Sequence, residues 1–200
     1  MPTFSDITLP TARLQLRPLA PGDADALFAL RSDPVVQRYG SHPPWTERQA
    51  AVDYLERDRR GMADGSHAQF ALERRADAAV IGTCTLYAIS PQCRRADIGY
   101  VLRPSDWGRG YATEALVALL DWGFGALDLN RVEADIDPRN VPSARILERL
   151  GFVHEGHLRE RWIVAGEVSD SGMYGLLARE WPAARAGVAS RAGPGAGAAP

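Results

Sequence analysis

The sequence contains no lysine, and all 23 of its basic residues are arginine. Enzymes that form a Schiff base on lysine or use a lysine amine as the nucleophile are therefore excluded. The same absence excludes the nucleotide-binding loop GxxxxGK(S/T), whose lysine reaches the phosphates. We attribute the arginine excess to genomic composition and not to a mechanism.

Cysteine and long apolar runs are scarce as well. Cys84 and Cys93 are too few for a disulfide framework and lack the spacing of a metal site, so we expect reduced thiols and no metal. No apolar run reaches the roughly 20 residues of a membrane span. Residues 1–10 lack the basic and apolar segments of a signal peptide. We therefore expect a cytoplasmic protein without a membrane partner.

Charge and length limit the remaining classes. The net charge is −2, which favours neither nucleic acid nor an anionic membrane as a partner. Two hundred residues suit one domain with a sizeable core. We predict that domain over residues 1–182. Residues 183–200 are rich in Ala, Gly and Pro and have almost no large apolar side chain, so we predict a flexible tail there.

Periodicity predicts an α/β chain. Apolar alternation and turn residues predict short strands, three of them consecutive and typical of an antiparallel meander, at residues 11–17, 67–74, 79–88, 93–102, 131–137, 152–162 and 163–177. Cap signals and helical spacing predict helices at residues 23–31, 33–40, 46–60, 111–127 and 142–150.

The stretch from Asp106 to Ala112 holds two glycines between a predicted strand and a predicted helix. Glycine permits a close backbone approach to a ligand, and the first amides of a helix lack partners inside it. Together they make a natural seat for a phosphate. The alternative is a tight connection that needs glycine for geometry alone. The dinucleotide pattern GxGxxG does not fit, because its sixth position is Thr113.

Four segments follow one another in a familiar order, at residues 94–102, 107–115, 131–134 and 140–152. This order resembles the GNAT superfamily of acyl-CoA-dependent N-acetyltransferases, and within it the branch that acetylates ribosomal-protein N-termini. The resemblance runs from about residue 9 to 181. It implies a GNAT-type α/β (α+β) fold, with a mixed, mostly antiparallel central sheet of about seven strands that is flanked by helices and whose central strands splay apart.

The resemblance also implies a binding site for acetyl-CoA. The pyrophosphate motif [Q/R]xxGx[G/A] maps onto residues 107–112, with Trp107 in the Gln/Arg position. The pantetheine arm lies between the splayed strands, where a main-chain N–H polarises the thioester carbonyl. The implied cofactor-binding residues are Ile98, Gly99, Tyr100, Val101, Leu102, Trp107, Gly108, Arg109, Gly110, Tyr111, Ala112, Thr113, Asn140 and Ser143.

Two carboxylates are candidates for the catalytic base. Asp97 lies in the A-D-I-G-Y stretch at a position that faces the acceptor in related enzymes, although an exposed strand carboxylate beside two arginines explains it equally well. Glu133 on the facing strand is the second candidate. An α-amine has a pKa near 8, so a carboxylate acting through water suffices.

Ser143 is the candidate proton donor for the departing thiolate. Many GNAT enzymes use a tyrosine further along this helix, and here that position is Leu147. Asn140, which contacts the pantetheine in the resemblance, is also a credible helix N-cap, with Pro142 in the first turn.

These features predict an acyltransferase that moves an acetyl group from acetyl-CoA to a primary amine by direct attack in a ternary complex. The resemblance favours a protein N-terminal α-amine as the acceptor. The alternatives are a small-molecule amine such as an antibiotic or a polyamine, or a non-catalytic acyl-CoA-binding module. The sequence leaves the acceptor's identity and the oligomeric state open.

Overall fold

The computed structural model describes residues 3–191 and is built on one eight-stranded sheet with the order β1-β2-β3-β4-β5-β6-β8-β7. Every neighbouring pair is antiparallel except β5 and β6, which are parallel. The strands are β1 (Leu9–Pro10), β2 (Leu14–Arg17), β3 (Ala68–Arg74), β4 (Ala79–Ser90), β5 (Arg95–Leu102), β6 (Arg131–Ile136), β7 (Val153–Val164) and β8 (Glu167–Leu177). The mixed, mostly antiparallel GNAT-type fold is confirmed; the eighth strand is the two-residue β1.

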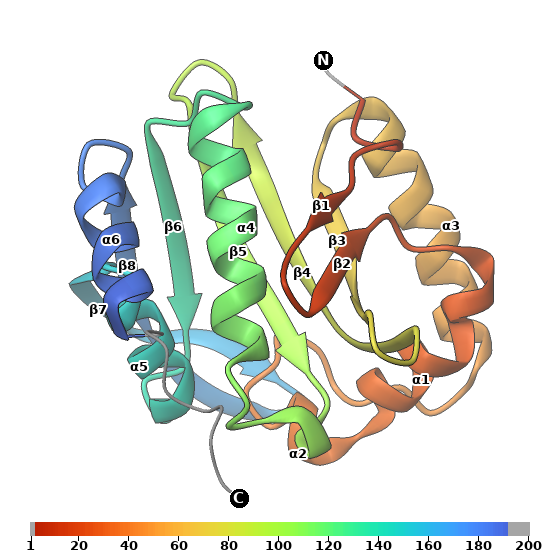
Figure 1. Ribbon diagram of the computed structural model, residues 1–200. Helices are drawn as coiled ribbons and strands as arrows, with labels where there is room; N and C mark the ends of the chain where they lie inside the picture. The colour runs from red at the N-terminus through yellow and green to blue at the C-terminus, as the bar shows by residue number, and fades with distance from the viewer. Residues whose placement is uncertain (1–2, 192–200) are drawn as a thin grey trace, which may run out of the picture.

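Six α-helices flank this sheet in the described part of the chain, and short 3-10 turns precede α1 and α4. Figure 1 shows α4 running along the middle of the sheet, with α5 and α6 near β6, β7 and β8, and α1 and α3 beside β2, β3 and β4. The helices are α1 (Ala24–Ser32), α2 (Pro34–Gln37), α3 (Gln49–Asp64), α4 (Tyr111–Gly125), α5 (Val141–Arg149) and α6 (Trp181–Arg191).

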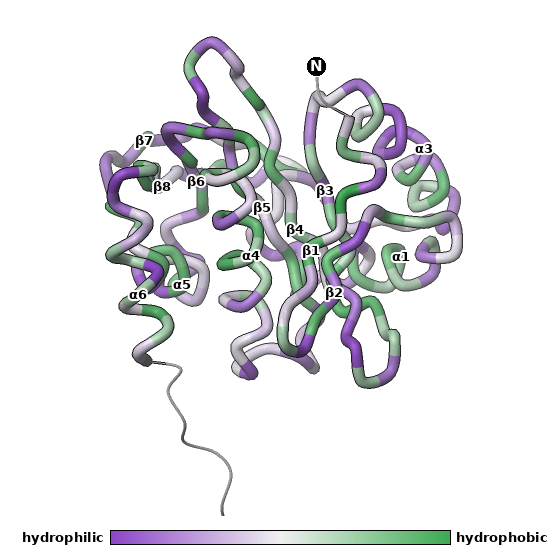
Figure 2. Tube along the Cα trace, turned by 45° about the horizontal axis from the view of Figure 1, so that its top comes forward, coloured by the Kyte–Doolittle hydropathy of each residue, from purple (hydrophilic) through white to green (hydrophobic). Residues whose placement is uncertain are grey.

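Two cores hold these layers together. The larger core joins α4 to the sheet, where Leu116, Leu119 and Leu120 are fully buried. Figure 2 shows hydrophobic segments concentrated along α4 and the central strands. A smaller core around Leu27 and Ala51 joins α1 to α3. Because the two cores are separate, α1 and α3 form their own layer beside the sheet.

The parallel strands β5 and β6 splay apart, as predicted. Only three residue pairs are aligned between the two strands, and the last pair is Asp97 with Glu133. Beyond that pair the strands diverge, and β5 continues to Leu102 while remaining paired with β4 on its other side (Figure 1). Arg103 N donates to Ile81 O on the β4 side (2.9 Å), and backbone groups alternate in direction along a strand. The amides and carbonyls of residues 98, 100 and 102 therefore face the opening.

The predicted flexible tail is wrong for its first part. From Trp181 the chain forms α6, in which Val188 is 9% exposed and Ala184 packs against the main core. Arg185 adds an ion pair with Asp121 on α4 (3.1 Å). Alanine favours helix, and one valine and one alanine are enough to dock so short a segment. The rest of the predicted tail, residues 192–200, lies outside the described residues.

Candidate active site

The turn between β5 and α4 exposes a row of backbone amides. Gly108 and Gly110 have φ values of 72° and 79°, in the left-handed region that favours glycine. Gly110 is the N-cap of α4, whose first intrahelical bond is donated by Glu114 N to Gly110 O. In the part of the chain that the structure describes, the six amides from Gly108 to Thr113 donate to no protein acceptor. Such a row at a helix N-terminus fits a pyrophosphate.

Charged side chains fix the entrance to this turn. Asp106 is 1% exposed and accepts hydrogen bonds from Arg103 and from Arg74 Nη1. Burial raises the pKa of Asp106, but the hydrogen bonds from Arg103 and Ser105, together with the charges of Arg103 and Arg74, outweigh burial and hold the pKa below its ordinary value. Trp107 Nε1 donates to Leu102 O (2.7 Å), so the tryptophan in the Gln/Arg position of the motif closes the turn instead of adding a charge.

Arg13, which directly precedes β2, contacts this turn, and no sequence pattern marked it as a site residue. Its Nη1 donates to Arg109 O (2.9 Å), and its guanidinium lies over the Tyr111 ring, 4.4 Å from the centroid. Its Nε donates to Glu114 Oε2 (2.6 Å), and Thr11 Oγ1 donates to Glu114 Oε1. Burial raises the pKa of Glu114, but these bonds outweigh it and lower the pKa overall. Roughly a hundred residues separate the partners, so no sequence pattern links them.

Asp97 and Glu133 face each other where the strands diverge, but their environments differ. Glu133 accepts hydrogen bonds from Arg95 and from Arg131 Nε (2.7 Å), and these bonds outweigh burial to lower its pKa. Asp97 Oδ1 is buried without a hydrogen-bond partner, and Arg95 Nη1 lies 3.9 Å from it. Burial and the charge of Glu133 raise the pKa of Asp97. Asp97 is therefore more available than Glu133 to accept a proton, because two guanidiniums bind the Glu133 carboxylate.

Ser143 lies at the opening of the sheet, in the first turn of α5. Asn140 caps this helix as predicted, because its side chain accepts from Ser143 N (3.2 Å). Ser143 Oγ lies 2.7 Å from the hydroxyl of Tyr100 on β5, and burial raises the pKa of Tyr100 to about 12. Leu147 is fully buried in the core. The tyrosine beside Ser143 therefore comes from β5 and not from α5. The sequence did not predict this contact.

Asp97 and the Ser143–Tyr100 pair lie on opposite faces of the sheet. Tyr100 is three residues after Asp97 on β5, and side chains alternate in direction along a strand. Tyr100 reaches Ser143 on α5, whereas Asp97 lies directly opposite Tyr87 of β4, with which it shares a face. The gap between β5 and β6 joins these faces. Asp97 and Ser143 therefore lie on either side of one opening.

Two cavities, of about 1060 Å³ and 390 Å³, open on the Asp97 face, and both are lined by Tyr87. Trp45, Tyr54 and Gln69 line the larger cavity, which lies between the α1–α3 layer and β3 and β4. Asp135 lines the smaller cavity, and its Oδ1 is buried without a partner. Burial and the charges of Asp97 and Asp135 raise the pKa of Tyr87 to about 12, so Tyr87 stands between the two carboxylates.

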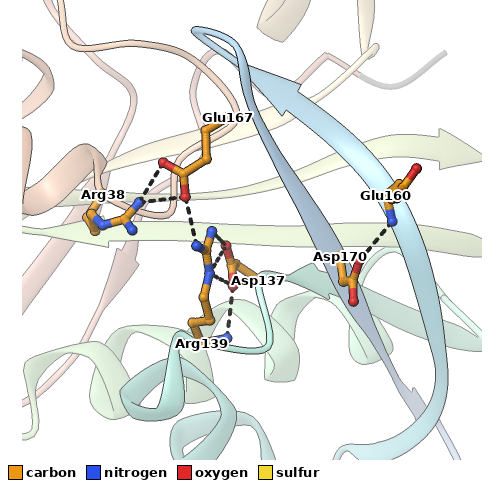
Figure 3. Close-up of polar contacts among 6 residues, drawn as sticks. All are labelled: Arg38, Asp137, Arg139, Glu160, Glu167 and Asp170. Carbon is orange, nitrogen blue, oxygen red and sulfur yellow. Dashed lines mark hydrogen bonds and ion pairs between the residues drawn. The ribbon is translucent and has the colours of Figure 1, made fainter.

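A chain of ion pairs borders the smaller cavity and ties the end of α2 to the β7–β8 hairpin (Figure 3). Arg38 donates to both oxygens of Glu167 (3.2 Å each), and Arg139 joins Glu167 (2.7 Å) to Asp137 (2.6 Å). Figure 3 also shows Asp170 of β8 accepting from the Glu160 amide of β7 (2.8 Å). The exposed pairs add little stability, but they hold the hairpin at the rim of the smaller cavity.

Residues 3–191 contain no cluster of three or more His, Cys, Asp or Glu side chains that could hold a metal ion. None of the helices described is both long and apolar enough to cross a membrane.

Comparison with known proteins identifies the family. Residues 13–153 match the model described as "Acetyltransferase (GNAT) domain". The chain is 39% identical to the uncharacterized N-acetyltransferase p20 of Bacillus licheniformis over 174 residues, which are 87% of this chain and 98% of that protein. It is 29% identical to the spermidine N(1)-acetyltransferase of Escherichia coli strain K12, over 80% of this chain and 83% of that protein.

A solved structure agrees with these relatives. RimJ of Mycobacterium smegmatis, solved in complex with CoA-disulfide, superposes with a TM-score of 0.84 at 28% identity, covering 96% of this chain and 98% of that chain. The row of free amides before α4, the diverging parallel strands and the match over most of the chain agree: the protein belongs to the GNAT family of N-acetyltransferases.

Proposed function

We propose that this N-acetyltransferase moves an acetyl group from acetyl-CoA to the α-amine of a protein or peptide. The carrying observation is that Asp97 and the Ser143–Tyr100 pair lie on opposite faces of the sheet at the gap between β5 and β6. This arrangement suits direct transfer, because the amine and CoA can reach the thioester carbon from different faces of the sheet and need not compete for the same space.

The donor half of the site fits the CoA moiety. The free amides of residues 108–113 hold the pyrophosphate, supported by the dipole of α4 and by Arg13. The backbone groups of residues 98 and 100 on the open edge of β5 pair with the pantetheine. The Leu102 carbonyl already accepts from Trp107, so at this residue the N–H is left for the ligand. Acetyl-CoA, when bound, supplies the thioester that is cleaved.

Asp97 and Ser143 then assist the transfer. The neutral amine attacks the thioester carbonyl, the C–N bond forms and the C–S bond breaks. Asp97, directly or through water, takes the proton that the nitrogen loses, and its raised pKa makes it a better proton acceptor than Glu133. Ser143 Oγ donates a hydrogen bond that stabilises the departing thiolate, which takes its proton from water, and Tyr100 OH, 2.7 Å away, holds the Ser143 hydroxyl in place. Glu133 acts by fixing Arg95 and Arg131 beside the base.

Two acceptor classes have support. Relatives assigned to the acetylation of ribosomal proteins favour a protein N-terminus. The relative that acts on spermidine favours a polyamine, and the unpartnered Asp97 and Asp135 oxygens are suited to a cationic amine of either class.

A direct assay separates these acceptors. The protein is incubated with acetyl-CoA and, in parallel, with peptides that begin with Ser or Ala, the same peptides blocked at the α-amine, and spermidine. CoA release and product mass are measured. We expect acetylation of the free peptides and none of the blocked ones. Acetylation of spermidine alone would contradict the peptide acceptor, and the absence of transfer to any amine would contradict the proposed activity.

A further inference from the structure

The wall of the larger cavity carries hydrogen-bond donors that have no partner among residues 3–191. Gln69 is 4% exposed, and its Nε2 is buried without an acceptor. Its Oε1 accepts from Tyr54 OH (2.6 Å), which orients the amide so that the NH2 group is the free end. Arg31 Nε is likewise buried without an acceptor, and both residues line the cavity. Buried donors left unpaired are costly, so their persistence points to a ligand.

Arg57 adds a second cation to this wall. Arg31 and Arg57 each lie 5.9 Å from the centroid of the Tyr54 ring. Within residues 3–191, neither guanidinium has a carboxylate within 4.0 Å. The carboxylates of this cavity are exposed or engaged elsewhere.

These carboxylates can be accounted for one by one. Asp58 accepts from His67 Nε2 (2.8 Å), Asp53 accepts from Gln49 Nε2 (2.8 Å), and Glu47 is exposed. The cations next to Tyr54 are therefore available to a ligand.

We propose that the larger cavity recognises a carboxylate of the acceptor, bound by Arg31, Arg57 and the Gln69 amide, while the amine of the same molecule lies beyond Tyr87 at Asp97. This inference rests on the proposed transfer to an amine and names the acceptor class: an amine that carries a carboxylate a few bonds away. Two sources share this chemistry, a peptide N-terminus followed by an acidic side chain and a free amino acid.

The charges argue against a polyamine in this cavity. A guanidinium binds a carboxylate through two parallel N–H donors, which gives both affinity and orientation. A second ammonium group placed beside Arg31 and Arg57 would instead meet like charge and leave the Gln69 NH2 unpaired. The site is thus bipolar, with the anionic Asp97 at one end and the cationic pair at the other.

The experiment compares ligands that differ only in the charge recognised. Peptides beginning Ser-Glu, Ser-Gln and Ser-Lys, with identical remainders and amidated C-termini, are tested together with free glutamate and spermidine. Binding to the CoA-loaded protein is measured by calorimetry, and kcat/KM is measured by CoA release. We expect the wild-type protein to prefer Ser-Glu over Ser-Gln by roughly 10- to 100-fold, the range of a charge-assisted hydrogen bond.

Variants assign the preference to the cavity. Arg57→Gln and Arg31→Gln are each expected to remove most of the Ser-Glu preference and to leave Ser-Gln binding unchanged. Arg57→Glu is expected to shift the preference toward Ser-Lys. Arg59→Gln is the matched control, an exposed arginine of the same helix that does not line the cavity. Arg57 is exposed, so its variants should fold, and CoA affinity verifies this.

The readouts distinguish this inference from the proposed function. Preferred binding of Ser-Glu or of free glutamate, lost in Arg57→Gln, supports the carboxylate site and tells which source fits, even if no product forms. Equal affinity for Ser-Glu and Ser-Gln, preferred binding of spermidine, or the same loss in Arg59→Gln would overturn the inference. Failure of acetyl transfer alongside selective binding would count against the proposed function alone.

Discussion

The donor half and the acceptor half of this site are built in different ways. The proposed CoA side is formed mainly by residues 98–113 with Asn140 and Ser143, is supported from outside by Arg13, and relies on backbone amides and on an open strand edge. The proposed acceptor side draws side chains from α1, α3, β3, β4, β5 and β6. Backbone recognition depends on local conformation, whereas side-chain recognition depends on which elements meet. The donor half should therefore be disrupted by one backbone change, and the acceptor half only by changes of individual charges.

The largest expected effect tests the donor half. Gly110→Asp places a β-carbon at a φ of 79° and a negative charge beside the free amides. We expect acetyl-CoA affinity to fall by at least about 100-fold, because two or more charge-assisted hydrogen bonds are lost. Calorimetry measures this, with circular dichroism to confirm folding.

The matched control for this variant is Gly166→Asp. Gly166 has a φ of 85° in the β7–β8 turn, and an added β-carbon meets nothing within 4 Å. It imposes the same backbone strain far from the amide row. If both variants lost CoA affinity equally, strain and not the phosphate seat would be responsible.

The next effect separates two neighbouring carboxylates. Asp97→Asn should lower kcat/KM by about 100-fold or more, the usual contribution of a positioned base. Glu133→Gln should cost less, because Glu133 is held by two arginines. The Asp97→Asn defect should shrink as pH rises and the amine becomes neutral on its own. If Glu133→Gln lowered kcat/KM as much as Asp97→Asn or more, Glu133 would be the base and Asp97 the supporting carboxylate.

The pKa of Asp97 also predicts a change in stability of a definite sign. Because its folded-state pKa is raised, the native protein binds the proton more tightly than the unfolded chain. This contribution to stability is present at low pH and is lost as pH rises through the folded-state pKa. At neutral pH, Asp97→Asn should therefore melt no lower than the wild type and should lose activity. Thermal melts at pH 4 and pH 7 would check this, and a lower melting temperature at pH 7 would contradict the raised pKa.

A smaller effect is expected for the hydroxyl pair. Ser143→Ala should lower kcat by about 10- to 100-fold, near the low end for an acid, because a thiol with a pKa of about 8.5 is already a fair leaving group. Tyr100→Phe should cost less, and the double variant should cost little more than Ser143→Ala, since both hydroxyls act on one thiolate. Single-turnover rates measure all three. If Ser143→Ala reacted at the wild-type rate, Ser143 would contribute only its backbone N–H, which binds the Asn140 cap.

The smallest effect lies outside both halves. Ending the chain at Pro182 removes most of α6, including the buried Val188 and the Arg185–Asp121 ion pair. We expect a loss of about 1–3 kcal/mol, or a melting temperature lower by roughly 2–10 °C, with CoA affinity unchanged. A chain ending at Arg191 is the control. Equal melting temperatures for the two would show that α6 does not stabilise the domain.

Local sequence signals predicted the elements of the donor half well. The N-cap of α5 at Asn140 was readable, because capping depends on a few adjacent residues. The end of the domain was misread, because α6 has a weak apolar pattern and is held by a few contacts with distant elements. Local signals could not identify Arg13, Tyr87 or the unpaired Nε2 of Gln69. Each matters through a partner far away in sequence.

The sequence by itself determined the family, the candidate phosphate-binding turn and the candidate residues Asp97, Glu133 and Ser143, because these depend on residue type and local spacing. The tertiary structure decided what those residues can do. Paired arginines hold Glu133, burial raises the pKa of Asp97, and Tyr100 arrives beside Ser143 from another element. Charge state and proton transfer depend on neighbours within a few ångströms, and only the folded chain brings those neighbours together.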